Sequence, residues 1–138
     1  MKALRFQPIA GRAEEIIDAI LRTPEVASCA KELFTIHLVC EELVVNVVDY
    51  AYPAGTDSYL NVEVEKKDGW LVLRFIDGGV AFNPLEREMP DVSLPLEERP
   101  IGGLGIFLTV QMMDEVSYER TGNKNILTVK KRISNEEE

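Results

Sequence analysis

Residues 33–52 form a long apolar run in which polar side chains recur at helical spacing. Glu42, Asn46 and Asp49 stand at i, i+4 and i+7, so they fall on one narrow stripe of a helix. Nearly every other position of the run is apolar, which predicts a helix buried on most sides. A carboxylate and an amide on such a helix indicate a polar pocket, because burying these groups without hydrogen-bond partners is costly in free energy. The alternative is that Glu42 is only the edge of a solvated face.

Length and composition predict one globular domain, because 138 residues that are 46% hydrophobic and 28% charged can bury a sizeable core. The net charge of −9 argues against nucleic acid as a direct partner. We expect a cytoplasmic protein without a membrane partner, because the first residues contain no apolar signal-peptide region and the long apolar run contains charges. Cys29 and Cys40 match no zinc or CxxC spacing and are expected to be buried free thiols.

The remaining elements are predicted from periodicity and turn signals. A short strand at Leu4–Phe6 and an amphipathic helix at residues 12–21 precede the central helix, which should end before Pro53. Alternating apolar residues predict four further strands, paired around Asp68-Gly69 and around a turn at residues 121–125. The predicted strands are residues 60–65, 71–75, 116–120 and 126–131, with a frayed tail at 134–138.

A carboxylate followed by glycines ends the second strand of the first pair, in the sequence Phe75-Ile76-Asp77-Gly78-Gly79. Glycines let a flat ring lie against the backbone, while Asp77 can accept a hydrogen bond from an exocyclic amine such as that of adenine. An ordinary Asp-Gly-Gly turn is the alternative interpretation.

The segment from Pro84 to Ile101 is irregular, with four prolines and seven charged residues, and its length is typical of a functional loop. It leads into Gly102-Gly103-Leu104-Gly105, directly before a predicted helix at residues 106–113. Glycines that open a helix expose backbone N–H groups at its positive end, which suits phosphate oxygens. A glycine-rich turn without a ligand is equally compatible with these residues.

The order of these motifs resembles the N, G1 and G2 boxes of the Bergerat-fold ATPases, the superfamily of gyrase and the histidine kinases. No GxxxxGK[ST] motif is present, so the chain is not a P-loop protein. Within the superfamily, three stretches are similar to the stand-alone anti-sigma-factor serine/threonine kinases: EELVVNVVDYAYP, IDGGVAFNP and GGLGIFLTVQMMDEVSYERTGNKNILTVKK. The resemblance covers roughly residues 4–132.

The resemblance implies a role for each matching residue. Glu42 matches the general base, Asn46 the Mg²⁺ ligand and Asp77 the carboxylate that reads adenine. The other nucleotide contacts implied are Gly79, Phe82, Gly102, Gly103, Leu104 and Gly105.

The chain departs from the family pattern within the central helix. Glu41 stands where a serine commonly precedes the base, and Tyr50 where a histidine is often found. Asp49 replaces a basic residue of many histidine kinases, which removes one possible phosphate contact and leaves its own role open. His37 is the only histidine and no dimerisation helix pair accompanies it, so we do not expect a phospho-accepting histidine.

By this resemblance the fold is α/β (α+β), a two-layer sandwich whose mostly antiparallel mixed sheet is covered by helices on one face, with a lid at residues 84–101. ATP and Mg²⁺ are the implied cofactors. The implied reaction is transfer of the γ-phosphoryl group to a serine or threonine of a small anti-sigma-antagonist (STAS-type) protein. A sigma factor as a second partner and a homodimer are also implied. Two alternatives stay open: an ATP-dependent adaptor that sequesters a partner without phosphorylating it, and a detached histidine-kinase catalytic domain.

Overall fold

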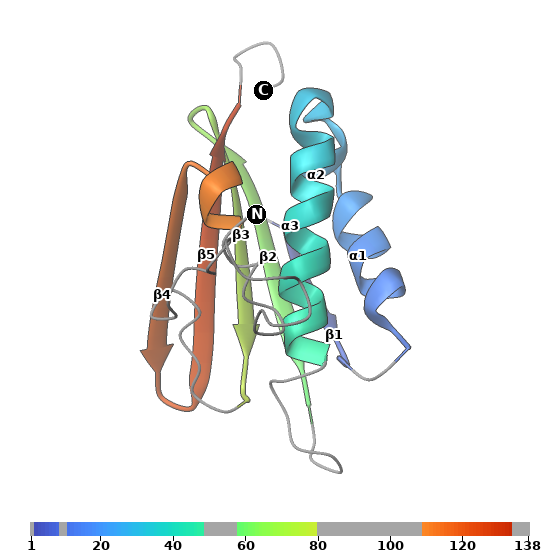
Figure 1. Cartoon of the computed structure of the whole chain (residues 1–138), viewed down its shortest axis with the longest axis vertical. Coiled ribbons are helices and arrows are strands. Elements are labelled where there is room, and N and C mark those ends of the chain that lie inside the picture. The colour runs from blue at the N-terminus through green and yellow to red at the C-terminus, as the bar shows by residue number, and fades with distance from the viewer. Residues whose placement is uncertain (1, 9–10, 49–57, 80–108, 134–138) are drawn as a thin grey trace, which may run out of the picture.

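The computed structural model describes residues 2–8, 11–48, 58–79 and 109–133, which form two layers. Helices α1 (Ala13–Leu21) and α3 (Leu33–Asn46) lie side by side on one face of a β-sheet (Figure 1). This arrangement confirms the predicted two-layer α+β sandwich with helices on one face.

The sheet has five strands in the order β1-β2-β3-β5-β4, and all four pairings are antiparallel. The strands are β1 (Lys2–Phe6), β2 (Leu60–Lys67), β3 (Trp70–Asp77), β4 (Glu115–Thr121) and β5 (Lys124–Arg132). No parallel pairing occurs between these described strands, although the sequence resemblance implied a partly mixed sheet.

Two tight turns set the register of the hairpins. Asp68 and Gly69 have φ of 54° and 82° between the paired residues Lys67 and Trp70, as a type I′ turn requires. In the second hairpin the turn is shorter than predicted, because Thr121 already pairs with Lys124 and only two residues connect the strands. The predicted turn at 121–125 was therefore too long, and Asn125 lies within β5.

Strands β2 and β3 bury every second side chain against the helices, because successive side chains of a strand point to opposite faces. Asp77 continues the inward-facing series of β3 after Leu73 and Phe75. The largest fully buried side chains of the core come from both layers: Ile16, Ile20, Val26, Ile36, Val39, Val44, Leu60, Val62, Val64, Leu71, Leu73 and Val129.

Short helical segments connect α1 to α3. Helix α2 (Pro24–Ala27) begins with Pro24 at its first position, and the buried Thr23 hydroxyl accepts from the Val26 backbone N–H at 3.5 Å. A single 3₁₀ turn, η1 (Ala30–Glu32), leads into α3. The sequence patterns did not indicate α2, because four residues carry no helical periodicity.

Helix α3 buries only one of its faces, contrary to the prediction of a helix buried on most sides. Its buried stripe contains Ile36, Val39, Cys40, Leu43 and Val44. The large exposed hydrophobic side chains among the described residues are Leu33, Phe34 and Val45, all on α3, and Phe34 is 72% exposed. Residues 47–48 continue α3 as a π-helical turn, and the expected end before Pro53 lies outside the described residues.

Candidate functional site

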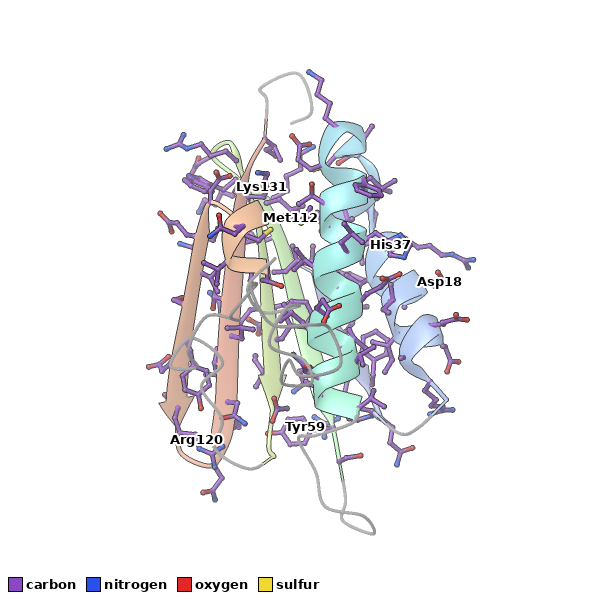
Figure 2. The ribbon with its side chains drawn as sticks, viewed as in Figure 1. Asp18, His37, Tyr59, Met112, Arg120 and Lys131 are labelled. Carbon is purple, nitrogen blue, oxygen red and sulfur yellow. The ribbon has the colours of Figure 1, made fainter. Side chains whose placement is uncertain are left out.

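Two of the predicted motifs lie at one end of the molecule, where a third chain segment joins them. The C-terminal end of α3, the beginning of β2 and the end of β3 all lie at the same end of the sheet (Figure 1). Figure 2 shows Tyr59 and Arg120 at this end as well. The fold therefore brings together segments separated by more than thirty residues in the sequence.

Glu42 and Asn46 lie on the border between the buried and exposed faces of α3. Both side chains are half-buried, whereas Leu43 is buried and Glu41 is exposed. Their spacing of four residues places them one above the other, about 6 Å apart along the helix axis. Glu42 and Asn46 thus form a polar pair at the edge of the core.

The environment of Glu42 favours its protonated form more than water does. Burial raises the pKa of Glu42 above its ordinary value, and the negative charge of Glu41 raises it further. Glu41 itself is about half exposed and lies 3.1 Å from His37 Nε2. The two neighbouring carboxylates therefore differ in environment, and Glu42 is the more buried of the two.

Asp77 is buried at the end of β3, with 7% of its surface exposed. Its Oδ1 accepts two hydrogen bonds, from the backbone N–H of Gly79 at 2.9 Å and from Asn125 Nδ2 at 3.0 Å. Among the described residues no donor reaches Oδ2. An ionised carboxylate held in this way can accept a hydrogen bond from a ligand at its second oxygen.

The pKa of Asp77 reflects two opposing influences. Burial raises the pKa above the ordinary value, while the hydrogen bonds from Asn125 and Gly79 and the charge of Arg120 lower it. Burial is the largest of these causes, so the net direction is upward.

Gly78 allows the ring of Tyr59 to approach the backbone after β3. A Cβ atom at Gly78 would lie 2.7 Å from Tyr59 Cε1 and 3.0 Å from its hydroxyl oxygen. On β1, the Arg5 guanidinium lies 4.8 Å from the centroid of the same ring. This contact explains the first glycine of the motif by packing, a role that the sequence did not reveal.

Several further predicted positions lie outside the described residues. These are Asp49, Phe82, Gly102, Gly103, Leu104, Gly105 and the predicted lid at 84–101. Of the helix predicted at 106–113, residues 109–112 are described and helical, and Lys131 Nζ donates to the Met112 carbonyl at 3.0 Å (Figure 2).

Sequence reasoning missed the groups that surround Asp77. Asn125 pairs with Asp77 in the register of β3 and β5, and Tyr118 and Arg120 both donate to Asn125 Oδ1. One signal was present: Asn125 stands two residues before Leu127 and four before Val129, at an inward-facing position of the strand. It was overlooked because the residue was assigned to the turn.

No group of three or more His, Cys, Asp or Glu side chains that could hold a metal ion occurs in the described part of the chain. The described helices also include none long and apolar enough to cross a membrane. Cys29 and Cys40 are both buried, as predicted.

Comparison with known proteins places this geometry in a family context. Residues 9–131 match the histidine kinase-like ATPase domain. Serine/threonine-protein kinase BtrW of Bordetella bronchiseptica is 27% identical over 100 residues, which are 72% of this chain and 70% of that protein. The solved structure of the Acinetobacter baumannii histidine kinase AdeS covers 98% of this chain, with a TM-score of 0.54 and 16% identity, and 69% of that chain is covered in return.

The structural similarity shows a shared fold, in agreement with the five-stranded sheet and its helical layer. The domain match covers the central helix, Asp77 and the hairpin that carries Asn125. This chain therefore belongs to the family of the histidine kinase-like ATPase domain, an ATP-binding, kinase-like fold.

Proposed function

We propose that this protein is a serine/threonine protein kinase of the anti-sigma-factor type, which binds Mg·ATP and phosphorylates a small STAS-type anti-sigma-antagonist protein. The observation that carries the proposal is that two carboxylates lie in different environments. Asp77 is buried and its Oδ1 already accepts two hydrogen bonds, whereas Glu42 is half-buried and its pKa is raised. The similarity to a protein named as a serine/threonine kinase supports the same class of reaction.

Asp77 is the proposed adenine-reading group. Its carboxylate offers acceptors only, and the adenine 6-amino group offers a donor. The burial of Asp77 strengthens such a hydrogen bond, since less water competes for the same oxygen. Gly79, whose N–H already holds Asp77, would border the base.

Asn46 is the proposed protein ligand of Mg²⁺. This ion prefers oxygen ligands and keeps several waters, so one amide oxygen together with triphosphate oxygens fits its needs. Bound Mg²⁺ would neutralise charge on the phosphates. Gly102, Gly103, Leu104 and Gly105 are proposed to contact those phosphates through backbone N–H groups, and Phe82 to border the nucleotide.

Glu42 is the proposed general base. As the hydroxyl oxygen of the partner's serine or threonine attacks the γ-phosphorus, the bond to the bridging oxygen of ADP breaks and Glu42 accepts the hydroxyl proton. A carboxylate with a raised pKa is a better proton acceptor than an ordinary one. His37 is paired with Glu41 on the exposed side of α3 and has no part in this scheme.

The proposal extends to the partners and the location. We infer that the enzyme acts in the cytoplasm as a homodimer, and that binding and inhibiting a sigma factor is its second role. These points rest on the resemblance to the anti-sigma-factor kinases.

The test compares two neighbouring substitutions, Glu42→Gln and Glu41→Gln, in a phosphorylation assay with labelled ATP and STAS-type proteins encoded beside this chain. We expect Glu42→Gln to lower the rate by about a hundredfold or more, while the Mg·ATP dissociation constant changes only a few-fold. Glu41→Gln, which removes an exposed carboxylate from the same helix, should keep most of the rate.

A parental rate in Glu42→Gln would show that Glu42 is not the base. If the parent protein never phosphorylates a partner that it demonstrably binds, the adaptor function replaces the kinase.

A further inference from the structure

A closed ring of hydrogen bonds joins the end of β3 to the hairpin of β4 and β5. Asn125 Nδ2 and the Gly79 N–H donate to Asp77 Oδ1, at 3.0 and 2.9 Å. Arg120 Nη1 donates to both the Gly79 carbonyl and Asn125 Oδ1, at 2.9 and 3.1 Å. Each of the four groups therefore contacts two others in the ring.

The chemistry of Arg120 fixes the orientation of the Asn125 amide. A guanidinium can only donate, so the amide oxygen must face Arg120 and the amide nitrogen must face Asp77. The Tyr118 hydroxyl also donates to Asn125 Oδ1, which reinforces this orientation. Rotating the amide by 180° would place its oxygen against the Asp77 carboxylate and its nitrogen against Arg120, and both contacts would be repulsive.

The ring in turn fixes the role of each Asp77 oxygen. Two donors occupy Oδ1, and among the described residues Oδ2 receives none. We propose that Asn125 and Arg120 are positioning residues that direct Asp77 Oδ2 to the bound base and so make the site select an amino group over a carbonyl group. This inference rests on the proposed function, in which Asp77 reads adenine.

The ring makes a specific prediction for the neutral variant Asp77→Asn. The donors Gly79 N–H and Asn125 Nδ2 would still require an acceptor, so the new amide oxygen would take the place of Oδ1. Its NH₂ group would then replace Oδ2 and would favour a base with a carbonyl at position 6. Inosine triphosphate (ITP) is the appropriate probe, because it differs from ATP only at this edge of the purine.

The experiment measures Mg·ATP and Mg·ITP dissociation constants by calorimetry for the parent and for Arg120→Leu, Arg120→Lys, Asn125→Leu and Asp77→Asn. The parent should prefer ATP by about tenfold or more, since a carbonyl would face an acceptor. Arg120→Leu and Asn125→Leu should reduce this preference several-fold, and Arg120→Lys, which retains a donor, should reduce it less. Asp77→Asn should reverse the preference towards ITP.

Asn123→Ala is the matched control, because Asn123 is an exposed residue of the turn that precedes Asn125. This variant should prefer ATP over ITP to the same extent as the parent. Arg120 is exposed as a residue, so Arg120→Leu tests the proposal even if Asn125→Leu fails to fold. The positioning role would be overturned if Arg120→Leu lost the same factor of affinity for ATP and for ITP. It would also be overturned if Asp77→Asn still preferred ATP over ITP. Failure of the folded parent to bind ATP would instead refute the proposed function itself.

Discussion

Gly78 and Tyr59 are in direct contact: a Cβ atom at Gly78 would lie 2.7 Å from Tyr59 Cε1, closer than side-chain packing tolerates. The contact joins the residue after β3 to the residue before β2, at the end of the sheet where Asp77 lies. Arg5 covers the same ring from β1. The position of the Asp77–Gly79 backbone therefore depends on how closely Tyr59 can approach.

Replacing Gly78 with alanine should disturb this contact. The added methyl group forces the ring or the backbone to move, and overpacking of this kind costs about 1–3 kcal/mol. Because Gly79 donates to Asp77, a shifted backbone should also weaken ATP binding. Chemical denaturation and calorimetry measure the two effects.

A double substitution, Gly78→Ala with Tyr59→Ala, serves as the control. If the methyl group acts through the ring, the added cost of Gly78→Ala should largely disappear in the Tyr59→Ala background. The same cost in both backgrounds would show that the Tyr59 contact does not explain the glycine.

Asp77→Asn should stabilise the nucleotide-free protein at neutral pH. Since burial raises the Asp77 pKa, the folded state binds a proton more tightly than the unfolded state, whose value is near 3.8. Stability of the parent therefore falls as pH rises from about 3.8 through the folded pKa. Asparagine does not titrate. The gain in free energy of unfolding of Asp77→Asn over the parent should therefore be absent in strong acid and reach its full size above the pKa of Asp77 in the folded state. Urea denaturation at several pH values measures it, and an advantage that does not change with pH would contradict the argument.

The scaffold was predictable where periodicity and turn chemistry act locally. The alternation in β2 and β3 and the Asp68-Gly69 turn determine one hairpin without reference to the rest of the chain. The stripe that contains Glu42 and Asn46 was visible for the same reason, because helical spacing alone places the two side chains together.

The surroundings of Asp77 were not predictable in this way. Asn125 contacts Asp77 because β5 pairs with β3 across 48 residues of sequence, and no local pattern indicates that pairing. The turn that precedes Asn125 was also assigned too many residues, which concealed its inward-facing position. The exposure of Phe34 was missed because an apolar residue on a helix indicates burial only when a second layer covers it.

Cys40 should be unreactive in the native protein. Burial raises the pKa of its thiol to about 12, so almost no thiolate is present at pH 8. Alkylation by iodoacetamide, followed by mass spectrometry of peptides, should label Cys40 only after denaturation. Rapid labelling in the folded protein would mean that this part of α3 opens readily.

Glu41 offers a way to test the environment of Glu42 without touching Glu42. The charge of Glu41 is one of the two causes that raise the Glu42 pKa, after burial. A general base must be ionised, so the phosphorylation rate should fall as pH decreases through this pKa. In Glu41→Gln the neighbouring negative charge is gone, the Glu42 pKa decreases, and the acid side of the rate profile should move to lower pH.

His37 must be considered in the same experiment, because its Nε2 lies 3.1 Å from the Glu41 carboxylate. The control His37→Gln retains the Glu41 carboxylate, so the acid side of the profile should not move to lower pH. If Glu41→Gln leaves the profile where it is in the parent, or moves it to higher pH, then the group that controls the rate is not Glu42.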